Sequence, residues 1–425
     1  MKIHIKNGRL IDPANGVDAP RDVFVAAGKI AAVGAMPDGF HVNRVIDAAG
    51  LVVCPGLIDL SARLREPGFE YKATLESEMA AAVAGGVTRL VCPPDTDPPL
   101  DEPGLVEMLK YRAKSLNLAK VYPLGALTQQ LAGERLTEMA ELADAGCVGF
   151  SHADAPLTNT QVMLRALQYA ATFGFTVWLR PEDALLAKNG VAHDGEVATR
   201  LGLPAIPACA ETIALSTLLL LAKETGARLH LCRISSREGV EMIRAAKRQG
   251  LPVTCDVSAN HVHLSEIDIG FFDAHCRLRP PLRSQRDRDS LSRALADGVI
   301  DAVCSDHTPV DEDAKLTPFA EAEPGATGLE LLLPLTLKWA ETRKMPLLDA
   351  LAKVTCAPAA ILGLEAGGVS PGQAADLCIF GPDRYWTVEP RRLRSQGKNT
   401  PFLGWALPGE VRYTVIDGHV VYEGC

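Results

Sequence analysis

The segment LVVCPGLIDLSARLREPG, residues 51–68, contains the pattern from which the fold can be predicted. Its apolar first part predicts a buried strand, and polar residues follow directly after it. Alternate residues of an extended chain face the same side, so Asp59, Ser61 and Arg63 are expected to point into one cavity. The segment therefore predicts a polar site at the end of a strand.

Seven further apolar runs have the same character, and helix-like stretches separate them. These runs cover residues 87–94, 120–127, 146–151, 175–180, 228–235, 251–258 and 299–306. Nearly continuous apolar strands are typical of parallel sheets that are covered on both faces. Residues 74–86, 158–174 and 237–250 repeat apolar positions at helical spacing. Eight alternations of strand and helix predict an α/β fold with a closed barrel of the TIM type.

The two ends of the chain have a different pattern, with short alternating segments and glycine turns. We predict that residues 1–50 and 366–425 form the N-terminal and C-terminal parts of one small β domain, beside a barrel formed by residues 51–365. The polar segment 311–325 follows the last predicted strand. Barrels carry lids at this position, so we expect a loop at the barrel mouth.

Composition excludes several classes of function. Lys and Arg total 43 and Asp and Glu total 52, which gives a net charge of -9 and argues against a general nucleic-acid binder. No apolar run reaches the ~18 residues that a membrane span needs, and the first residues lack the core of a signal peptide. The 11 cysteines form no C-x-x-C pair, and many lie in apolar runs. We therefore expect reduced core cysteines in a cytoplasmic protein.

The order of motifs along nearly the whole chain resembles that of the dihydroorotases of the amidohydrolase superfamily. The matching segments include PGLIDLSARLREPGFEYKATLES (55–77), FSHADAPL (150–157), SDHTPV (305–310) and PFAEAEPGATGLE (318–330). The resemblance implies an amidohydrolase barrel. In active members it also implies a zinc site, usually binuclear, that serves to open or close the dihydroorotate ring.

The resemblance places the metal ligands of active members at six positions of this chain, most of which hold other residue types. These positions are Ser61, Arg63, Ala153, Arg180, Arg233 and Asp306. A zinc site needs about three to four imidazole, thiolate or carboxylate ligands, and arginine has no lone pair to donate. We therefore expect no bound zinc or other metal, no cofactor and no catalytic residue, with Asp306 as a vestige.

The positions that hold substrate in the family are mixed. Arg65, which would hold the substrate carboxylate, is present, whereas Asp95 and Arg279 replace two asparagines and Val310 replaces a histidine. Arg65, Asp95 and Arg279 are predicted to form a vestigial substrate or anion pocket.

Other chemically competent residues have alternative interpretations. His152, His261 and His263 could supply an altered metal site, although we favour structural roles, with the last two in a loop after the seventh strand. His230 is predicted in the core and His307 as a support for its loop. Cys232 and Cys304 could act as nucleophiles, but no adjacent base is evident, so core packing is favoured.

Three arginines at metal positions suggest a replacement for the metal itself. Arg63, Arg180 and Arg233 could fill the space of two zinc ions and pair with carboxylates, for which Asp306, Glu182 and Asp59 are the candidates.

The resulting hypothesis is a non-catalytic subunit, because inactive relatives of this kind associate with the catalytic subunit of aspartate carbamoyltransferase in pyrimidine synthesis. Self-association is also possible, the loops 65–75 and 307–325 are candidate interfaces, and no nucleic-acid or membrane partner is expected. The alternatives are a metal-dependent amidohydrolase of cyclic amides with an altered metal site, or a small-anion sensor.

Overall fold

The computed structural model describes residues 1–424, and the predicted α/β barrel is confirmed. The barrel strands are β8 (Leu57–Asp59), β9 (Val87–Cys92), β10 (Lys120–Pro123) with β11 (Gly125–Ala126), β12 (Phe150–Ser151), β13 (Thr176–Leu179), β16 (Arg228–Leu231), β17 (Val253–Ser258) and β18 (Ala302–Cys304). Neighbouring strands pair in parallel around the ring. A parallel bridge between Ala62 and His307 closes the ring between β8 and β18.

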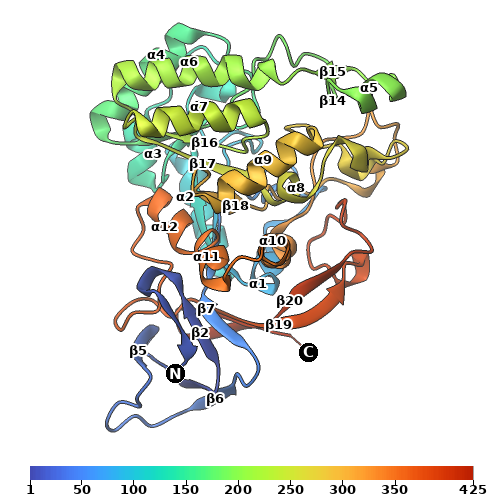
Figure 1. Cartoon of the computed structure of the whole chain (residues 1–425). Helices are drawn as coiled ribbons and strands as arrows, with labels where there is room; N and C mark the ends of the chain where they lie inside the picture. Colours follow the sequence, from blue (N-terminus) through green and yellow to red (C-terminus); the bar gives the residue numbers. More distant parts are fainter. Residues whose placement is uncertain (425) are drawn as a thin grey trace.

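Helices cover the outside of the barrel (Figure 1). The main helices are α1 (Leu75–Ala84), α2 (Pro103–Ser115), α3 (Met139–Ala145), α4 (Thr160–Phe173), α6 (Cys209–Thr225), α7 (Arg237–Arg248), α9 (Gln285–Ala296) and α10 (Leu332–Arg343). Shorter elements are α5 (Glu196–Leu201), α8 (Ala259–His263), α11 (Leu347–Ala352), α12 (Cys356–Leu362) and the strand pair β14 (Ala192–His193) and β15 (Ala205–Ile206). Thr74 and Ser77 form a capping box that starts α1, which satisfies backbone donors that the helix leaves free.

A small β domain, built from both ends of the chain, lies beside the barrel. One sheet has the order β5-β4-β1-β6 and the other β21-β20-β19-β7-β2-β3. The strands are β1 (Lys2–Lys6), β2 (Arg9–Asp12), β3 (Val17–Pro20), β4 (Val23–Ala26), β5 (Lys29–Val33), β6 (Arg44–Asp47), β7 (Val52–Pro55), β19 (Leu377–Thr387), β20 (Ala406–Ile416) and β21 (His419–Glu423). In Figure 1 the blue N-terminal strands and the red C-terminal strands lie together below the barrel helices. Their facing side chains form a separate apolar core that includes Ile3, Val53 and Ile379.

The apolar run 51–60 differs from the prediction, because it is divided between two sheets. β7 pairs with β19 and β2 in the small domain, whereas β8 pairs with β9 in the barrel. Gly56 lies between the two strands, and a Cβ atom at this position would collide with the side chain of Thr88. Only glycine allows this close approach, so the run is one extended segment that serves both domains.

Ion pairs at the junction with the small domain show which end of the barrel that domain covers. Asp376 of that domain receives Arg89 Nη2 at 2.6 Å and Lys120 Nζ at 3.0 Å. Both basic residues lie near the starts of barrel strands, so the small domain covers that end. The carboxyl ends of the strands open on the other side, where barrel sites assemble. Within residues 1–424, no helix combines the length and apolar character that a bilayer span requires.

Candidate functional site

Arg63 lies at the barrel mouth just after β8 and is bound by two carboxylates. Its Nε donates to Asp95 Oδ2 at 2.7 Å, and its Nη2 donates to Asp154 Oδ2 at 2.6 Å. The third nitrogen, Nη1, donates to Thr308 Oγ1 at 3.0 Å and lies 3.7 Å from Asp306 Oδ1. The Arg63 side chain is 5% exposed, so all its donors are satisfied inside the protein.

Asp154 is the centre of the arrangement, because two further arginines also contact it. Arg180 Nε donates to Asp154 Oδ1 at 2.6 Å, and Arg233 Nη2 donates to the same oxygen at 2.7 Å. Arg233 Nη1 also donates to Asp306 Oδ1 at 2.9 Å. Three guanidinium groups from three barrel strands therefore converge on one carboxylate, an arrangement that we call the Asp154 hub.

The network continues outward through Glu182. Arg180 Nη1 lies 2.7 Å from Glu182 Oε2, and Arg279 Nη2 donates to Glu182 Oε1 at 2.5 Å. Four arginines and four carboxylates thus face one another, and we call these eight residues the arginine layer. They are Arg63, Arg180, Arg233 and Arg279 with Asp95, Asp154, Glu182 and Asp306, so basic and acidic groups are equal in number.

Arg65 is placed differently from the other arginines. Its Nε donates to the carbonyl oxygen of Pro309 at 2.8 Å, and no carboxylate within residues 1–424 forms an ion pair with it. Burial, and then the charge of Arg63, lower the pKa of Arg65. Of the three residues predicted to form a pocket, Asp95 and Arg279 therefore belong to the arginine layer, whereas Arg65 lies outside it.

The arginines change the acidity of the carboxylates that they contact. Burial acts to raise the pKa of Asp154, but Arg233 and Arg180 hold that pKa well below its usual range. Burial also opposes ionisation of Glu182, but Arg180 and Arg279 lower its pKa to about 2. Both carboxylates are therefore ionised near neutral pH, as stable ion pairing requires.

Two other aspartates have the opposite shift. Burial raises the pKa of Asp306 more strongly than Arg233 and Arg63 lower it. Burial also raises the pKa of Asp59 to about 6, against the effect of its hydrogen bonds from Ser305. Both carboxylates are buried, and the cost of desolvating their charged forms exceeds the effect of their favourable contacts.

The backbone at the mouth has an unusual conformation at several site positions. Arg65, Ala153, Arg233 and Asp306 have positive φ values of 62°, 49°, 54° and 51°. Residues with side chains adopt this left-handed region infrequently, and such conformations cluster at functional sites. Four of the positions at the mouth therefore have a backbone conformation that is uncommon for residues with side chains.

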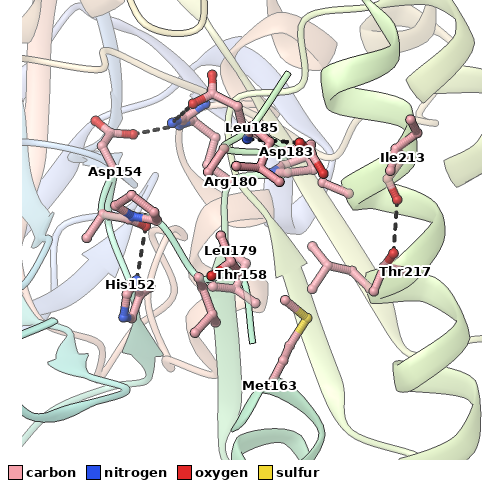
Figure 2. Close-up of a pocket in the computed structure, with 18 of the residues that line it drawn as sticks. His152, Asp154, Thr158, Met163, Leu179, Arg180, Asp183, Leu185, Ile213 and Thr217 are labelled. Atoms are coloured by element: carbon pink, nitrogen blue, oxygen red, sulfur yellow. Dashed lines mark hydrogen bonds and ion pairs between the residues drawn. The ribbon is translucent and has the colours of Figure 1, made fainter. Parts of the chain in front are cut away.

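A pocket of about 170 Å³ opens beside the Asp154 hub. Figure 2 shows His152 and Asp154 on one side of it, and Ile213 and Thr217 of helix α6 on the other. Arg63, Arg65 and Asp306 do not line this pocket. The open pocket therefore lies next to the converging guanidinium groups, and Arg180 is part of its lining.

The donor set at the mouth does not fit the zinc site that the fold family implies. Ser61 and Ala153 leave two of the six positions without a strong ligand, and Arg63, Arg180 and Arg233 place positive charge at three others. Asp306 is already bound by Arg233. These six positions together supply one carboxylate and no imidazole or thiolate, and a divalent ion needs more ligands than that.

The histidines proposed as substitute ligands are held in other interactions. His152 is buried and contacts Thr128 Oγ1 at 2.9 Å and Ala155 O at 3.0 Å through its two ring nitrogens. His261 and His263 lie in the short helix α8 rather than in a loop, and their Nε2 atoms contact the carbonyl oxygens of Pro281 and Leu335. None of the three joins the hub.

His307 supports the mouth from behind. Its Nδ1 accepts hydrogen bonds from the backbone N–H groups of Gly328 and Leu329, at 3.0 and 3.4 Å. Its Nε2 therefore carries the proton and donates to Glu78 at 2.6 Å. This contact fixes the loop that follows β18, as the sequence suggested.

One group within residues 1–424 has the composition of a metal site, namely His230, Cys232 and Asp256, whose ligand atoms lie within 4.8 Å of one another. His230 Nε2 contacts Asp256 at 3.0 Å and its Nδ1 contacts Thr254 at 2.8 Å, so neither nitrogen is free to activate the thiol. Burial, and then Asp256, raise the pKa of Cys232 well above its usual value. The thiol is therefore held in its protonated form, which is a poor nucleophile.

One site expectation requires correction, and one residue was missed. Asp59 does not pair with an arginine: its carboxylate accepts hydrogen bonds from the backbone N–H and hydroxyl groups of Ser305. Asp306 is contacted by Arg233 and Arg63 but not by Arg180, which binds Asp154 and Glu182 instead. The missed residue is Asp154, which directly follows the predicted position Ala153. Three buried arginines need carboxylate partners, and this need is the signal that could have pointed to it.

Comparisons with known proteins agree with the geometry of the barrel. Residues 50–239 match the model of the family described as dihydro-orotase-like, and residues 250–422 match that of an amidohydrolase family. The dihydroorotase-like protein of Pseudomonas aeruginosa is 45% identical over 424 residues, with 100% of both chains covered. The dihydroorotase of Geobacter sp. (strain M21) is 41% identical over 426 residues, again with 100% of both chains covered.

Solved structures of hydantoinases share the fold. The L-hydantoinase (dihydropyrimidinase) from Arthrobacter aurescens superimposes with a TM-score of 0.89 at 26% identity, covering 99% of this chain and 96% of that one. A D-hydantoinase superimposes with a TM-score of 0.83 at 22% identity, covering 100% of this chain and 95% of the other. Full-length identity to dihydroorotase-like proteins, on a barrel of this kind, shows that the chain belongs to the dihydroorotase-like family of amidohydrolases.

Proposed function

We propose that this chain is a non-catalytic member of its family, in which ion pairs have replaced the metal centre. The observation that carries the proposal is the Asp154 hub, where Arg63, Arg180 and Arg233 contact one carboxylate at 2.6 to 2.7 Å. Without a metal, no bound water is acidified to attack a cyclic amide near neutral pH. The buried thiols offer no replacement nucleophile, because their pKa values are raised.

We further propose that the chain serves in the cytoplasm as an assembly partner of the catalytic subunit of aspartate carbamoyltransferase, in pyrimidine biosynthesis. The support is the family resemblance, together with a complete barrel that lacks catalytic ligands. A stable obligate interface of this kind should bury about 2,000 Å² or more.

A second candidate is a metal-dependent amidohydrolase acting on cyclic amides. It is favoured by the full-length relatives named dihydroorotase, which are 38 to 41% identical to this chain. For this activity, metal would have to displace the arginines or bind elsewhere, such as at His230, Cys232 and Asp256.

Metal analysis and activity assays separate the two candidates. The purified chain is incubated with zinc, desalted and analysed for bound metal, and opening of the dihydroorotate ring is then measured. We expect no stoichiometric zinc and no turnover; tightly bound zinc with turnover would establish the amidohydrolase instead.

Assembly is tested separately by co-expression with the transcarbamoylase, followed by size-exclusion chromatography and light scattering. We expect one complex of fixed stoichiometry. Two separate peaks, with transcarbamoylase activity indifferent to this chain, would refute the assembly role while leaving the lack of catalysis intact.

A further inference from the structure

A groove of about 680 Å³ lies at the junction of the barrel and the small domain, between the end of α2 and the turn that joins β20 to β21. Its apolar lining includes Leu118 and Val121 from the barrel, and Ile416 and Val421 from the small domain. Tyr111 stands at its edge with 77% of its side chain exposed. The α2–β20 groove thus offers an apolar floor to a side chain from outside.

Basic residues surround this floor. Lys110, Lys114 and Lys120 line the groove, against a single acidic lining residue, Asp417. Lys120 is neutralised, because its Nζ lies 2.7 Å from Asp417 and 3.0 Å from Asp376.

The other two lysines differ from Lys120 in their contacts. Lys110 Nζ donates only to the carbonyl oxygen of Ala145, at 3.3 Å, and within residues 1–424 neither Lys110 nor Lys114 forms an ion pair. Two uncompensated cations therefore flank an apolar floor on a chain whose net charge is -9. This local excess of positive charge favours an anionic occupant of the groove.

The groove is independent of the arginine layer. Lys120 is the first residue of β10, so the groove lies at the amino ends of the barrel strands, whereas the Asp154 hub lies at their carboxyl ends. An occupant of the groove would therefore bind at the face that barrels do not use for catalysis.

We propose that the α2–β20 groove binds an extended acidic segment of a partner protein. An apolar side chain of that segment enters between Leu118 and Val421, and flanking carboxylates meet Lys110 and Lys114. A peptide fits both features of the groove, because it can present apolar and acidic groups alternately. Nucleic acid fits less well, because the floor is aliphatic and bases stack on aromatic side chains. This inference does not depend on the assembly role proposed above.

The test uses the full chain and a short fluorescent peptide in which glutamates flank a leucine–phenylalanine pair. We expect saturable binding that weakens as salt rises, because exposed charge pairs are screened. Hydrogen exchange should show protection of residues 110–121 and 416–421 by the bound peptide. The same peptide with glutamine in place of glutamate should bind much more weakly.

Lys114→Glu reverses the charge of an exposed lysine at the rim of the groove. It should weaken peptide binding about tenfold, because association becomes slower, and the salt dependence of binding should be lost. The matched control is Lys223→Glu, which also replaces an exposed lysine in the last turn of a helix, here α6, and it should bind as the unmodified chain does. No binding of the glutamate peptide, equal binding of the glutamine peptide, or an unchanged affinity of Lys114→Glu would each overturn the proposal. Protection elsewhere on the chain, or tighter binding of a single-stranded oligonucleotide at the same residues, would also overturn it.

Discussion

Arg63 Nη2 donates a hydrogen bond to Asp154 Oδ2 at 2.6 Å, although 91 positions separate the two residues in the chain. The bond connects the end of the first barrel strand to the end of the fourth, across the barrel mouth. It makes the stability of the mouth depend on charge balance, and this dependence can be measured.

Asp154→Asn should lower the free energy of unfolding by about 3 to 5 kcal/mol, because it leaves three buried guanidinium groups without their shared carboxylate. Urea unfolding followed by circular dichroism measures the change. Asp311→Asn is the control, because Asp311 is exposed and contacts only its own turn. Similar small effects of both substitutions would contradict the role of the Asp154 hub.

Arg63 and Arg65 should differ sharply when each is replaced by methionine. Arg63→Met leaves Asp95 without its ion-pair partner and removes one of the three guanidinium groups from Asp154, so it should cost about 3 kcal/mol or more. Arg65→Met loses one hydrogen bond, to Pro309, and should cost only about 1 kcal/mol.

The same pair of variants tests the anion-sensor hypothesis. If the unpaired guanidinium of Arg65 holds an anion, phosphate or sulfate should raise the melting temperature of the unmodified chain but not that of Arg65→Met. Equal stabilisation of both would exclude Arg65 as the anion site.

Asp59 predicts a distinctive pH dependence. Its pKa is about 6 in the folded protein and near 3.9 in an unfolded chain, so between these values the folded state holds the extra proton. Its contribution to stability is complete below about pH 4 and is lost as the pH rises through 6. Relative to Asp59→Asn, the unmodified chain should therefore gain about 1.4 kcal/mol when the pH falls from 7.5 to 5. A constant difference between the two proteins over this range would contradict the raised pKa.

Glu182 predicts the opposite dependence at lower pH. Its folded pKa of about 2 lies below that of the unfolded chain, so its stabilising effect is present above about pH 4.5 and is lost as the pH falls toward 2. Glu182→Gln should show a shallower acid unfolding curve in that window. An unchanged slope would indicate that Glu182 is not bound by Arg180 and Arg279 in solution.

Restoring two histidines should not restore an enzyme. Ser61→His with Arg63→His returns the first pair of ligands, but Ala153, Arg180 and Arg233 still lack the required donors. We expect no ring-opening activity, together with lower stability, because Asp95 and Asp154 lose Arg63. Zinc-dependent turnover by this double variant would show that the arginine layer is not what prevents metal binding.

The sequence predicted the barrel because its signals are local. Each strand is a short apolar run followed by a helix with a recognisable start, such as Thr74 before α1. The position of the arginines at the mouth followed from the same pattern, because strand ends meet at one face.

The partners of the arginines could not be predicted with the same success. Asp59 and Asp154 both lie near strand ends, but only the coordinates show that Asp59 faces Ser305 and that Asp154 faces three guanidinium groups. Such pairing depends on barrel register and on loop conformation, as in the left-handed turn at Ala153. These long-range relationships leave no periodic signal in the sequence.

The extended segment 52–59 has a consequence for how the two domains can be treated. Only Gly56 separates β7, which pairs within the small domain, from β8, which pairs within the barrel. The domains are therefore joined by one continuous extended segment, which pairs with strands of both domains, and not by a flexible linker. Replacing this small domain with that of a relative would therefore require a junction inside this extended segment. A cut before residue 57 would remove β7, an inner strand, from the six-stranded sheet of the small domain.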